Sequence, residues 1–592
     1  MNRAINYTSL TLIPKNDHPV TVKEYRSIAG CTVLNKIISK VLASRLQKVI
    51  ASVVCEAQAE FIPSRKISDN IFLAQELVKS YTRMNISPRC MIKIDLQKAY
   101  DSVEWIFLEQ VLDELGFPRQ FTMYILECVK TVNYSILVNG KPTAPFDATK
   151  GLRQGDPISP FLFALAMEYL NDLLLFSRGD VESVSILNRC FLDFSSASGL
   201  QANKETSSIY FGGVTQIIQD QILHLLGFPK GELPFKYLGI PLSTKKISLL
   251  QWKPLINKMV ARISSWIAKK LSYAGRSQLI QTVLFSIQAY WSQLFSIPSK
   301  VLSTIEAYCR SYLWSGTNTI TRKALNAWDK VCTPKSMGSL GLLNIRLWNK
   351  AAIAKASWDI ENKADRLWIG WLDAYYIKNQ QFSQMSIPQQ ARWMVRKIFE
   401  ARDTVAVIQD IKTGSLIKQS YLKLIGDNER TTWKTLRFGN DARPKAQFTV
   451  WLQMHGKLMT VDRLASWGIN VDPICNLYNS HNEIRNHVFM ECPFSSKVWE
   501  GVLKWVQVPL FRTSQWEQME KWIIKASKGK SHRAQIFKLA YTEWVHTMRI
   551  ERNQRRFEKI AKSLSQLVRE IAYVCNIRAS TRIKKLVQQL SI

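Results

Sequence analysis

The stretch KIDLQKAYDSV at residues 93–103 joins a short apolar run to a helix-like segment. The apolar run 90–96 carries Asp95 near its end, where a charge is costly unless it is paired or binds a cation. Enzymes that join phosphodiesters place carboxylates at such points to hold two Mg²⁺ ions about 4 Å apart. The alternative is that Asp95 or Asp101 caps the following helix, which we favour for Asp101. For Asp95 taken alone the two interpretations are balanced.

A second stretch, KGLRQGDPISP at residues 150–160, precedes the apolar run 161–167. Its two glycines allow a close backbone approach, and its two prolines are suited to opening a helix. Arg153 and Gln154 offer hydrogen-bond donors to a phosphate or a base. The alternative is an ordinary glycine turn before a buried helix.

Charge is the outstanding global property of the 592 residues: 80 Lys and Arg stand against 46 Asp and Glu, a formal net charge of +34. This excess favours a polyanionic partner, nucleic acid first and an acidic membrane surface second, over a generally solvated basic surface. The composition excludes a wholly disordered, collagen-like or coiled-coil protein. No apolar run is long enough for a membrane span, and no signal core opens the chain. Ten scattered cysteines fit a reducing compartment.

Local patterns predict alternating helices and strands at the beginning of the chain and helices after it. We expect helices over Asn35–Ile50 and Glu104–Leu115 and a strand over Cys90–Leu96. Asn139-Gly140 predicts a tight hairpin after the strand 134–138. Residues 250–440 are helix-like, and residues 521–592 hold 17 Lys and Arg against 4 Asp and Glu.

The two stretches together, KIDLQKAYDSVEW and KGLRQGDPISPFLF, resemble motifs A and B of reverse transcriptases encoded by plant non-LTR retrotransposons of the long interspersed element type. The resemblance continues in order through FIPSRKISDN (61–70), SGLQAN (198–203), FKYLGIPL (235–242) and RSYLWSG (310–316). It implies an α/β right-hand polymerase fold. The expected parts are fingers and an incomplete palm at 1–243, a mostly α-helical thumb at 244–330, a helical connector at 331–442, a small Cys/His module at 443–510 and a basic helical tail at 511–592.

The resemblance also implies roles for individual residues. Asp95 would ligate a catalytic Mg²⁺ or Mn²⁺, Tyr100 would be the steric gate against a ribose 2′-hydroxyl, and Arg65 would face the incoming nucleotide's phosphates. Gln154 and Gly155 would pack along nucleotide and template. The primer grip would be Phe235, Lys236, Tyr237, Leu238 and Gly239, followed by a thumb whose Lys and Arg hold the template–primer backbone. The implied partners are an RNA template, a DNA primer and dNTPs in the nucleus, with no membrane and no protein partner predicted.

The active-site hairpin departs from the family. The family has further residues after the motif B helix and then a strand carrying an aromatic-Ala-Asp-Asp box. Here the helix expected at 161–170 runs straight into Asn171-Asp172, with Asn171 at the position of the first metal-binding Asp. A neutral amide cannot replace a carboxylate that bridges two hard cations. We therefore predict an internally deleted copy that does not polymerise, the alternative being a non-catalytic basic nucleic-acid-binding protein. Either a genomic deletion or an intron wrongly assigned in the gene model would explain the missing residues.

Lesser departures include Ser27, Ser64 and Thr206, the last at the position of an expected Lys that would protonate the leaving pyrophosphate. The chain also begins inside the fingers by this resemblance, so we expect an N-terminally truncated element without its endonuclease.

The pattern Cys475-x2-Tyr478-x8-His487-x4-Cys492 resembles the zinc-binding domain that follows many plant reverse transcriptases. The family has Cys where this chain has Tyr478, and a structural Zn²⁺ takes four nitrogen or sulfur ligands. We favour a metal-free helical module. The alternative is weak Zn²⁺ binding by Cys475, His487 and Cys492, with His481 or water completing the shell.

Overall fold

A computed structural model describes residues 3–16, 18–59, 61–63, 65–79, 81, 86–168, 174–267, 271–364, 366–378, 380–406, 415–426 and 429–590. Its contacts divide the chain into two compact units. The first unit is Met1–Gln251 with Ala356–Asp403, and the second is Trp252–Lys355 with Thr404–Ile592. Among the helices that are described, none combines the length and the apolar character needed to cross a bilayer.

The first unit contains a five-stranded sheet in the order β2-β1-β4-β5, with β6 also pairing with β4. Its strands are β1 (Tyr7–Pro14), β2 (Tyr25–Cys31), β4 (Asn133–Val138), β5 (Lys141–Pro142) and β6 (Phe146–Asp147). The predicted hairpin is confirmed: Val138 pairs with Lys141 across a turn in which Asn139 and Gly140 have φ values of 51° and 78°. Positive φ at both central positions is what a tight hairpin turn requires, and Asn-Gly supplies it at little cost.

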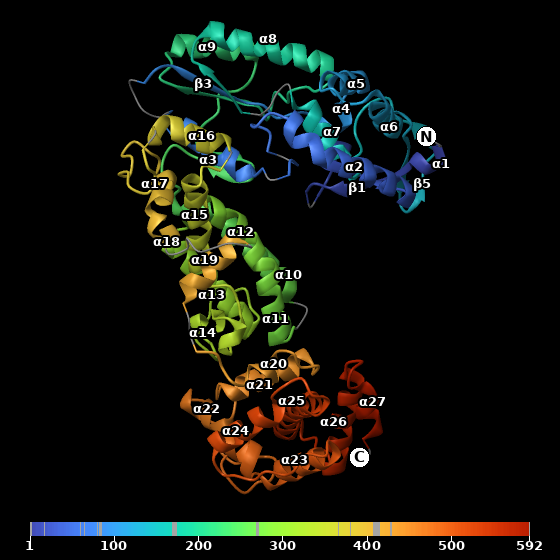
Figure 1. Cartoon of the computed structure of the whole chain (residues 1–592), viewed down its shortest axis with the longest axis vertical. Helices are drawn as coiled ribbons and strands as arrows, with labels where there is room; N and C mark the ends of the chain where they lie inside the picture. The colour runs from blue at the N-terminus through green and yellow to red at the C-terminus, as the bar shows by residue number, and fades with distance from the viewer. Residues whose placement is uncertain are drawn as a thin grey trace. The chain divides into compact units, whose positions relative to one another are not determined.

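A second sheet, with three antiparallel strands in the order β7-β3-β8, lies at the centre of the predicted palm. The predicted strand is confirmed as β3 (Arg89–Lys93), flanked by β7 (Leu174–Arg178) and β8 (Ser208–Gly212). Helices α8 (Val181–Ser198) and α9 (Gln216–Leu226) cover one face of this sheet (Figure 1). Ile92, Phe191 and Ile222 belong to the apolar core between them. A buried middle strand explains the apolar run in the sequence.

A second group of helices builds the larger core of this unit. The predicted helices are confirmed as α2 (Val33–Val53) and α5 (Trp105–Glu114). They pack with α6 (Arg119–Lys130) and α7 (Ser159–Ala166) around Leu46, Leu108 and Leu162, which are fully buried. Helix α7 ends at Ala166, and the last two residues of the helix expected at 161–170 lie outside the described residues. The other described helices that begin before residue 251 are α1 (Arg3–Asn6), η1 (Val22–Glu24), α3 (Ile67–Val78), α4 (Ala99–Ser102) and η3 (Leu249–Trp252).

Residues 356–403 return to the first unit and pack on α3. Their helices are α16 (Leu367–Leu372), η6 (Asp373–Ile377), α17 (Trp393–Glu400) and the beginning of α18 (Arg402–Ala406). The buried Glu76 carboxylate accepts a hydrogen bond from the Tyr376 hydroxyl at 2.9 Å and another from the Arg392 amide at 3.0 Å. This contact unites part of the predicted connector with the fingers and palm. The expected boundaries at 243, 330, 442 and 510 remain predictions.

In the second unit the described elements are helical, apart from a single bridge between Ile474 and Asn482. Before residue 356 they are α10 (Lys253–Ile267), α11 (Tyr273–Leu279), η4 (Ile280–Leu284), α12 (Phe285–Leu294), α13 (Ser299–Ser315), α14 (Trp328–Cys332), η5 (Lys335–Met337) and most of α15 (Ile345–Glu361). The later ones are α19 (Leu416–Ile425), α20 (Lys434–Arg437), α21 (Pro444–Met454), α22 (Val461–Ser466), η7 (His487–Glu491), α23 (Pro493–Trp505), α24 (Trp516–Ser527), α25 (His532–Asn553), η8 (Gln554–Glu558), α26 (Leu564–Arg578) and α27 (Lys584–Gln589).

Helix α21 connects the two parts of the second unit. The Tyr273 ring stacks on Phe448 at 5.4 Å, and the Trp451 indole N–H donates to the Gly338 carbonyl at 2.8 Å. Trp451 is fully buried, so its polar nitrogen needs this partner. The loop at residues 338–341 is thereby anchored on a helix about 110 residues later in the chain.

Candidate active site and Cys/His cluster

Asp95 lies just beyond β3, and the loop before β8 holds it. Its amide donates to the Ser207 hydroxyl at 3.0 Å, and its carbonyl accepts from the Asn203 amide at 2.7 Å. Its carboxylate accepts a 2.6 Å hydrogen bond from the Thr206 hydroxyl. Asp95 is exposed to solvent, which makes its charge inexpensive to keep. Asp95 therefore does not cap a helix. Thr206 was not predicted as its partner, because in the sequence this residue is only a departure from the family's lysine.

Several residues that the sequence assigned to one site do meet in a cavity of about 240 Å³. Asp95 and Tyr100 from the motif A stretch line it together with Tyr237 and Leu238 from the predicted primer grip. The Tyr100 ring stacks on Phe163 of α7, with centroids 4.7 Å apart and planes 14° from parallel. Phe163 and Met167 complete this wall, and neither was predicted as a site residue. Their signal was available in the apolar run after the motif B loop.

The predicted primer grip is a short hairpin of β9 (Phe235–Tyr237) and β10 (Ile240–Leu242). Leu238 and Gly239 form its turn with φ values of 47° and 81°. Phe235 stacks on Tyr210 of β8 at 4.5 Å, so the hairpin is attached to the three-stranded sheet by an aromatic contact. Lys236 and Gly239 are exposed, whereas Tyr237 is buried against the cavity.

Arg65 has a different environment from the one that the resemblance implies. Its guanidinium donates to the carbonyls of Ala51 at 3.0 Å, Val54 at 2.8 Å and Gln58 at 2.9 Å, and also to that of Cys55. The last turn of a helix leaves such carbonyls without partners, so Arg65 caps the C-terminal end of α2. It does not line the cavity beside Asp95. Its contact with a nucleotide stays a prediction.

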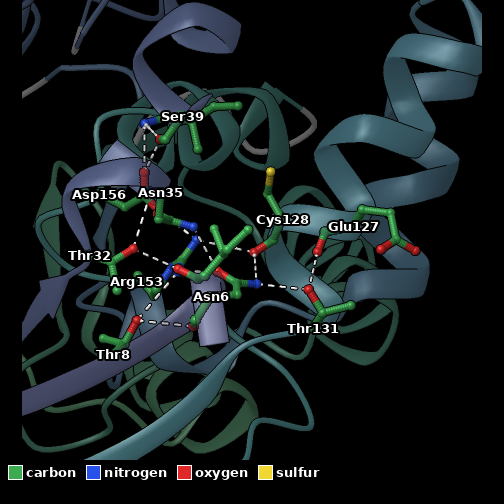
Figure 2. Close-up of polar contacts among 12 residues, drawn as sticks. Asn6, Thr8, Thr32, Asn35, Ser39, Glu127, Cys128, Thr131, Arg153 and Asp156 are labelled. Atoms are coloured by element: carbon green, nitrogen blue, oxygen red, sulfur yellow. Dashed lines mark hydrogen bonds and ion pairs between the residues drawn. The ribbon is translucent and has the colours of Figure 1, made fainter. Parts of the chain in front are cut away.

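The motif B loop is held by a buried charge pair (Figure 2). Arg153 and Asp156 are almost inaccessible to solvent, and their side chains form an ion pair at 2.7 Å. Arg153 also donates to Asn6 at 2.6 Å and to the Cys128 carbonyl at 3.1 Å. Asp156 accepts from the Ser39 hydroxyl and from the Ile158 amide at 3.3 Å. The expectation that Arg153 offers donors to a phosphate is therefore wrong, because its guanidinium is enclosed by protein acceptors.

The two glycines allow the backbone conformation of the loop. Gly151 has a φ of +89°, and a Cβ there would lie 2.7 Å from the Asp101 carbonyl oxygen, so no larger residue fits. Gly155 has a φ of +108° and is exposed together with Gln154, whose carbonyl accepts from the Ala29 amide at 3.0 Å. Neither Gln154 nor Gly155 lines the cavity. Burial raises the pKa of the nearby Asp101 carboxyl, an effect that Lys98 and Lys15 oppose.

Asn171 and Asp172 lie outside the described residues, as does Ser64. Over the part of the chain that the structure describes, Asp95 belongs to no group of three His, Cys, Asp or Glu side chains that could hold one ion. Among the described residues Asp95 is thus one exposed carboxylate with a hydroxyl partner, whereas a two-metal site needs carboxylates that bridge both ions.

Cys475, His487 and Cys492, by contrast, form such a group within the second unit. Their ligand atoms lie within 4.8 Å of one another, and all three residues are buried. His487 begins η7, and the Cys492 amide donates to the His487 carbonyl at 2.7 Å, which fixes the two ligands relative to each other. A hydrogen bond from the Cys475 thiol lowers the pKa of Cys492 to about 7, whereas the same contact raises the pKa of Cys475.

The donors of this cluster suit a borderline-soft ion such as Zn²⁺. The Nε2 atom of His487 is buried and has no hydrogen-bond partner, which is costly for an imidazole nitrogen unless an ion occupies that side. A metal bound there would tie Cys475 to the beginning of α23, which adds to the stability of the module. These residues therefore fit the group that the resemblance implies.

A separate charge cluster supports the same module. The buried Glu483 carboxylate accepts from Arg552 at 3.0 Å, lies 3.5 Å from Arg556 and accepts from the Val461 amide at 3.1 Å. It joins the Cys/His loop to α22 and α25 without a metal. Sequence reasoning passed over Glu483, because a lone Glu in a polar loop gives no sign that it will be buried.

Comparison with known proteins places these features in context. Residues 13–242 match the family model "Reverse transcriptase (RNA-dependent DNA polymerase)", and residues 416–499 match "zinc-binding in reverse transcriptase". The uncharacterized 149 kDa protein of transposon TX1 from Xenopus laevis is 25% identical over 53% of this chain and 26% of its own length. The Pol polyprotein of a type-2 retrotransposable element of Drosophila melanogaster is 25% identical over 34% of this chain and 21% of its own length.

A putative ribonuclease H protein of Arabidopsis thaliana is 28% identical over 27% of this chain and 24% of its own length. Thus the chain spans about a quarter of these curated relatives. Among solved structures, Candida tropicalis telomerase in complex with a fragment of telomeric RNA is 10% identical, with a TM-score of 0.30 over 62% of this chain and 64% of that one. Residues 13–242 are therefore similar to reverse transcriptases and residues 416–499 to the zinc-binding domain found in them, and parts of the chain are similar to a transposon protein and to the Pol polyprotein of a retrotransposable element.

Proposed function

We propose that this chain derives from the RNA-directed DNA polymerase of a plant non-LTR retrotransposon and that it does not polymerise DNA itself. The observation that carries the proposal is the cavity beside Asp95, where Tyr100, Tyr237 and Leu238 meet. These are the positions that the resemblance assigns to the metal ligand, the sugar gate and the primer grip. Polymerases of this family use a divalent metal, with an RNA template, a DNA primer and dNTPs as partners.

We infer inactivity because the sequence has no carboxylate at the position where Asp95 would need a partner. Two-metal transfer requires carboxylates that bridge both ions, and Asn171 offers an amide where the family has the first Asp of its box. In addition, only residues 167–173 separate α7 from β7, which leaves little chain for the strand that carries the box in the family.

The test is extension of a DNA primer on an RNA template by the purified chain, with Mg²⁺ or Mn²⁺ and all four dNTPs. We expect no incorporation above that of Asp95→Asn, which serves as the matched control. Clear incorporation that Asp95→Asn abolishes would overturn inactivity and retain the polymerase assignment. Sequencing the genomic DNA between the codons for Asn171 and Asp172 then separates a deletion from an invented intron.

A second function, binding nucleic acid without catalysis, is favoured by the outer face of α26 and α27. Tyr573 and Ile577 are 68% and 60% exposed, and Arg569, Arg582, Lys584 and Lys585 are exposed in the same segment. Cations contact phosphates, and an exposed aromatic ring can stack on an unpaired base. The acidic Glu570 on this helix is paired with Lys562 at 2.6 Å.

This function predicts RNA affinity that falls steeply with salt. The double variant Lys584→Glu/Lys585→Glu should reduce the slope of log K against log salt by about 2, since each lost phosphate contact removes about 1. Lys528→Glu/Lys530→Glu makes the same charge change elsewhere in the tail and is the control. Equal loss in both double variants would mean that net charge, and not this face, determines the binding.

A further inference from the structure

The Cys/His cluster lacks a ligand at the position where the related zinc-binding domains have a second cysteine. Tyr478 occupies that position and is 54% exposed, whereas the three available ligands are buried. A neutral phenol is a poor ligand for Zn²⁺, which takes four nitrogen or sulfur donors in a tetrahedron. The fourth donor must therefore come from another residue or from solvent.

The loop that follows Cys475 brings a histidine back to the cluster. The Asn479 amide donates to the Cys475 carbonyl at 2.7 Å, which turns the chain immediately after the first ligand. The Cys475 amide then donates to the His481 carbonyl at 2.8 Å, and Ile474 forms a bridge with Asn482. These backbone contacts hold His481 directly opposite Cys475, although five residues lie between them in sequence.

The side chain of His481 lies next to the buried ligand His487. Their rings are 5.4 Å apart at the centroids and inclined by only 29°. His487 is 2% exposed, and its Nε2 atom has no hydrogen-bond partner. An unpartnered nitrogen in so buried a place points to an ion on that side of the ring, which is the side on which an additional ligand must converge.

His481 is not among the three residues whose ligand atoms already converge, but one of its nitrogens has a hydrogen-bond partner. Nδ1 lies 2.8 Å from the Ser480 hydroxyl. A histidine that ligates a metal through one nitrogen commonly has a hydrogen-bond partner on the other, which fixes its tautomer and the direction of its ring. His481 is exposed, so its ring can turn toward the cluster without displacing core side chains.

We propose that this chain binds Zn²⁺ through Cys475, His487, Cys492 and His481, with His481 in place of the missing cysteine. Two thiolates and two neutral imidazoles balance the charge of the ion, so the buried site has no net charge to desolvate. The proposal is independent of the proposed function, because metal binding in the second unit needs neither the cavity nor RNA.

The test measures metal directly on the full chain. Purified protein should hold stoichiometric zinc, and Co²⁺ in its place should show the absorption of a tetrahedral site with thiolate ligands. His481→Ala should weaken metal affinity at least about 10-fold in competition with a chelator while retaining the thiolate charge-transfer bands. Tyr478→Phe and His532→Ala, which change an exposed phenol and another exposed histidine, should alter neither measurement.

Two cysteine variants keep the test decisive if the alanine variant folds poorly. His481→Cys should retain tetrahedral Co²⁺ binding and strengthen the thiolate bands, because a third thiolate replaces the imidazole. Tyr478→Cys should make a subsequent His481→Ala change harmless. The proposal is overturned if the chain binds no zinc, or if His481→Ala leaves affinity and spectrum unchanged, which would assign the fourth position to water. Loss of binding in Tyr478→Phe would assign that position to the phenol and equally overturn the proposal.

Discussion

By the family resemblance, the cavity beside Asp95 and the Cys475–His487–Cys492 cluster would each lack one metal ligand, but the surroundings of the two sites differ. Asp95 is exposed, and its carboxylate is bonded to Thr206. In the cluster three ligands are buried and lie within reach of one ion, and a fourth donor is on the adjacent loop. A ligand on a loop can be replaced by a neighbouring side chain, whereas a ligand on a strand depends on the whole strand being present.

The largest expected effect tests whether the scaffold under the cavity is intact. Arg153→Ala leaves the Asp156 carboxylate buried without its cation, and removing one partner of such a pair costs roughly 3–5 kcal/mol. Urea denaturation of the purified chain measures the loss. Lys150→Ala, which breaks the exposed pair with Glu104, should cost no more than about 1 kcal/mol. Equal costs for the two variants would mean that the motif B loop is not held by its buried charges.

A smaller effect distinguishes the two roles of Arg65. If Arg65 caps α2, Arg65→Ala should lower the free energy of unfolding by about 2–3 kcal/mol, because several carbonyls lose a charged donor. The nucleotide affinity of the Arg65→Ala variant, measured by equilibrium dialysis, should then equal that of the parent chain. The opposite result is weaker nucleotide binding at unaltered stability. It would restore the role that the resemblance implies, in which Arg65 contacts a nucleotide bound in the cavity.

The smallest expected effect is a pH dependence near the Cys/His module. Burial, reinforced by Arg443, Arg549 and Lys445, lowers the pKa of His546 to about 4, and its Nδ1 lies 3.0 Å from the Thr449 hydroxyl. The unfolded chain binds this proton more readily, so the contribution of His546 is complete above about pH 6.5 and is lost as the pH falls toward 4. Between pH 7 and 5 the loss should be about 2 kcal/mol.

His546→Gln is the control for this dependence, since glutamine can still bond to Thr449 but does not titrate. Denaturation curves of both proteins at pH 7 and pH 5, with a chelator present, separate this histidine from those of the cluster. If the variant loses as much stability as the parent chain, the pH response comes from the ligands of the Cys/His cluster and not from His546.

Some features of the structure were predictable from the sequence and others were not. The strand before Asp95, helices α2 and α5 and the Asn139-Gly140 hairpin were predictable, because apolar spacing and turn chemistry are local. The meeting of Asp95, Tyr100 and Tyr237 in one cavity was implied by the family resemblance alone. The environments of Arg65 and Arg153 could not be predicted, because a sequence does not show whether a guanidinium faces solvent or a set of protein carbonyls.

By itself, the sequence determined the local elements, the excess of positive charge and the identities of the ligands, since these depend on residue types and short spacings. Only the tertiary structure decided what each side chain meets. It buried Arg153 with Asp156, gave Asp95 a threonine partner, packed residues 356–403 on α3 and left the Nε2 atom of His487 without a hydrogen-bond partner. The reason is physical: burial and desolvation depend on contacts between residues that are distant in the chain, and these set the cost of every charge.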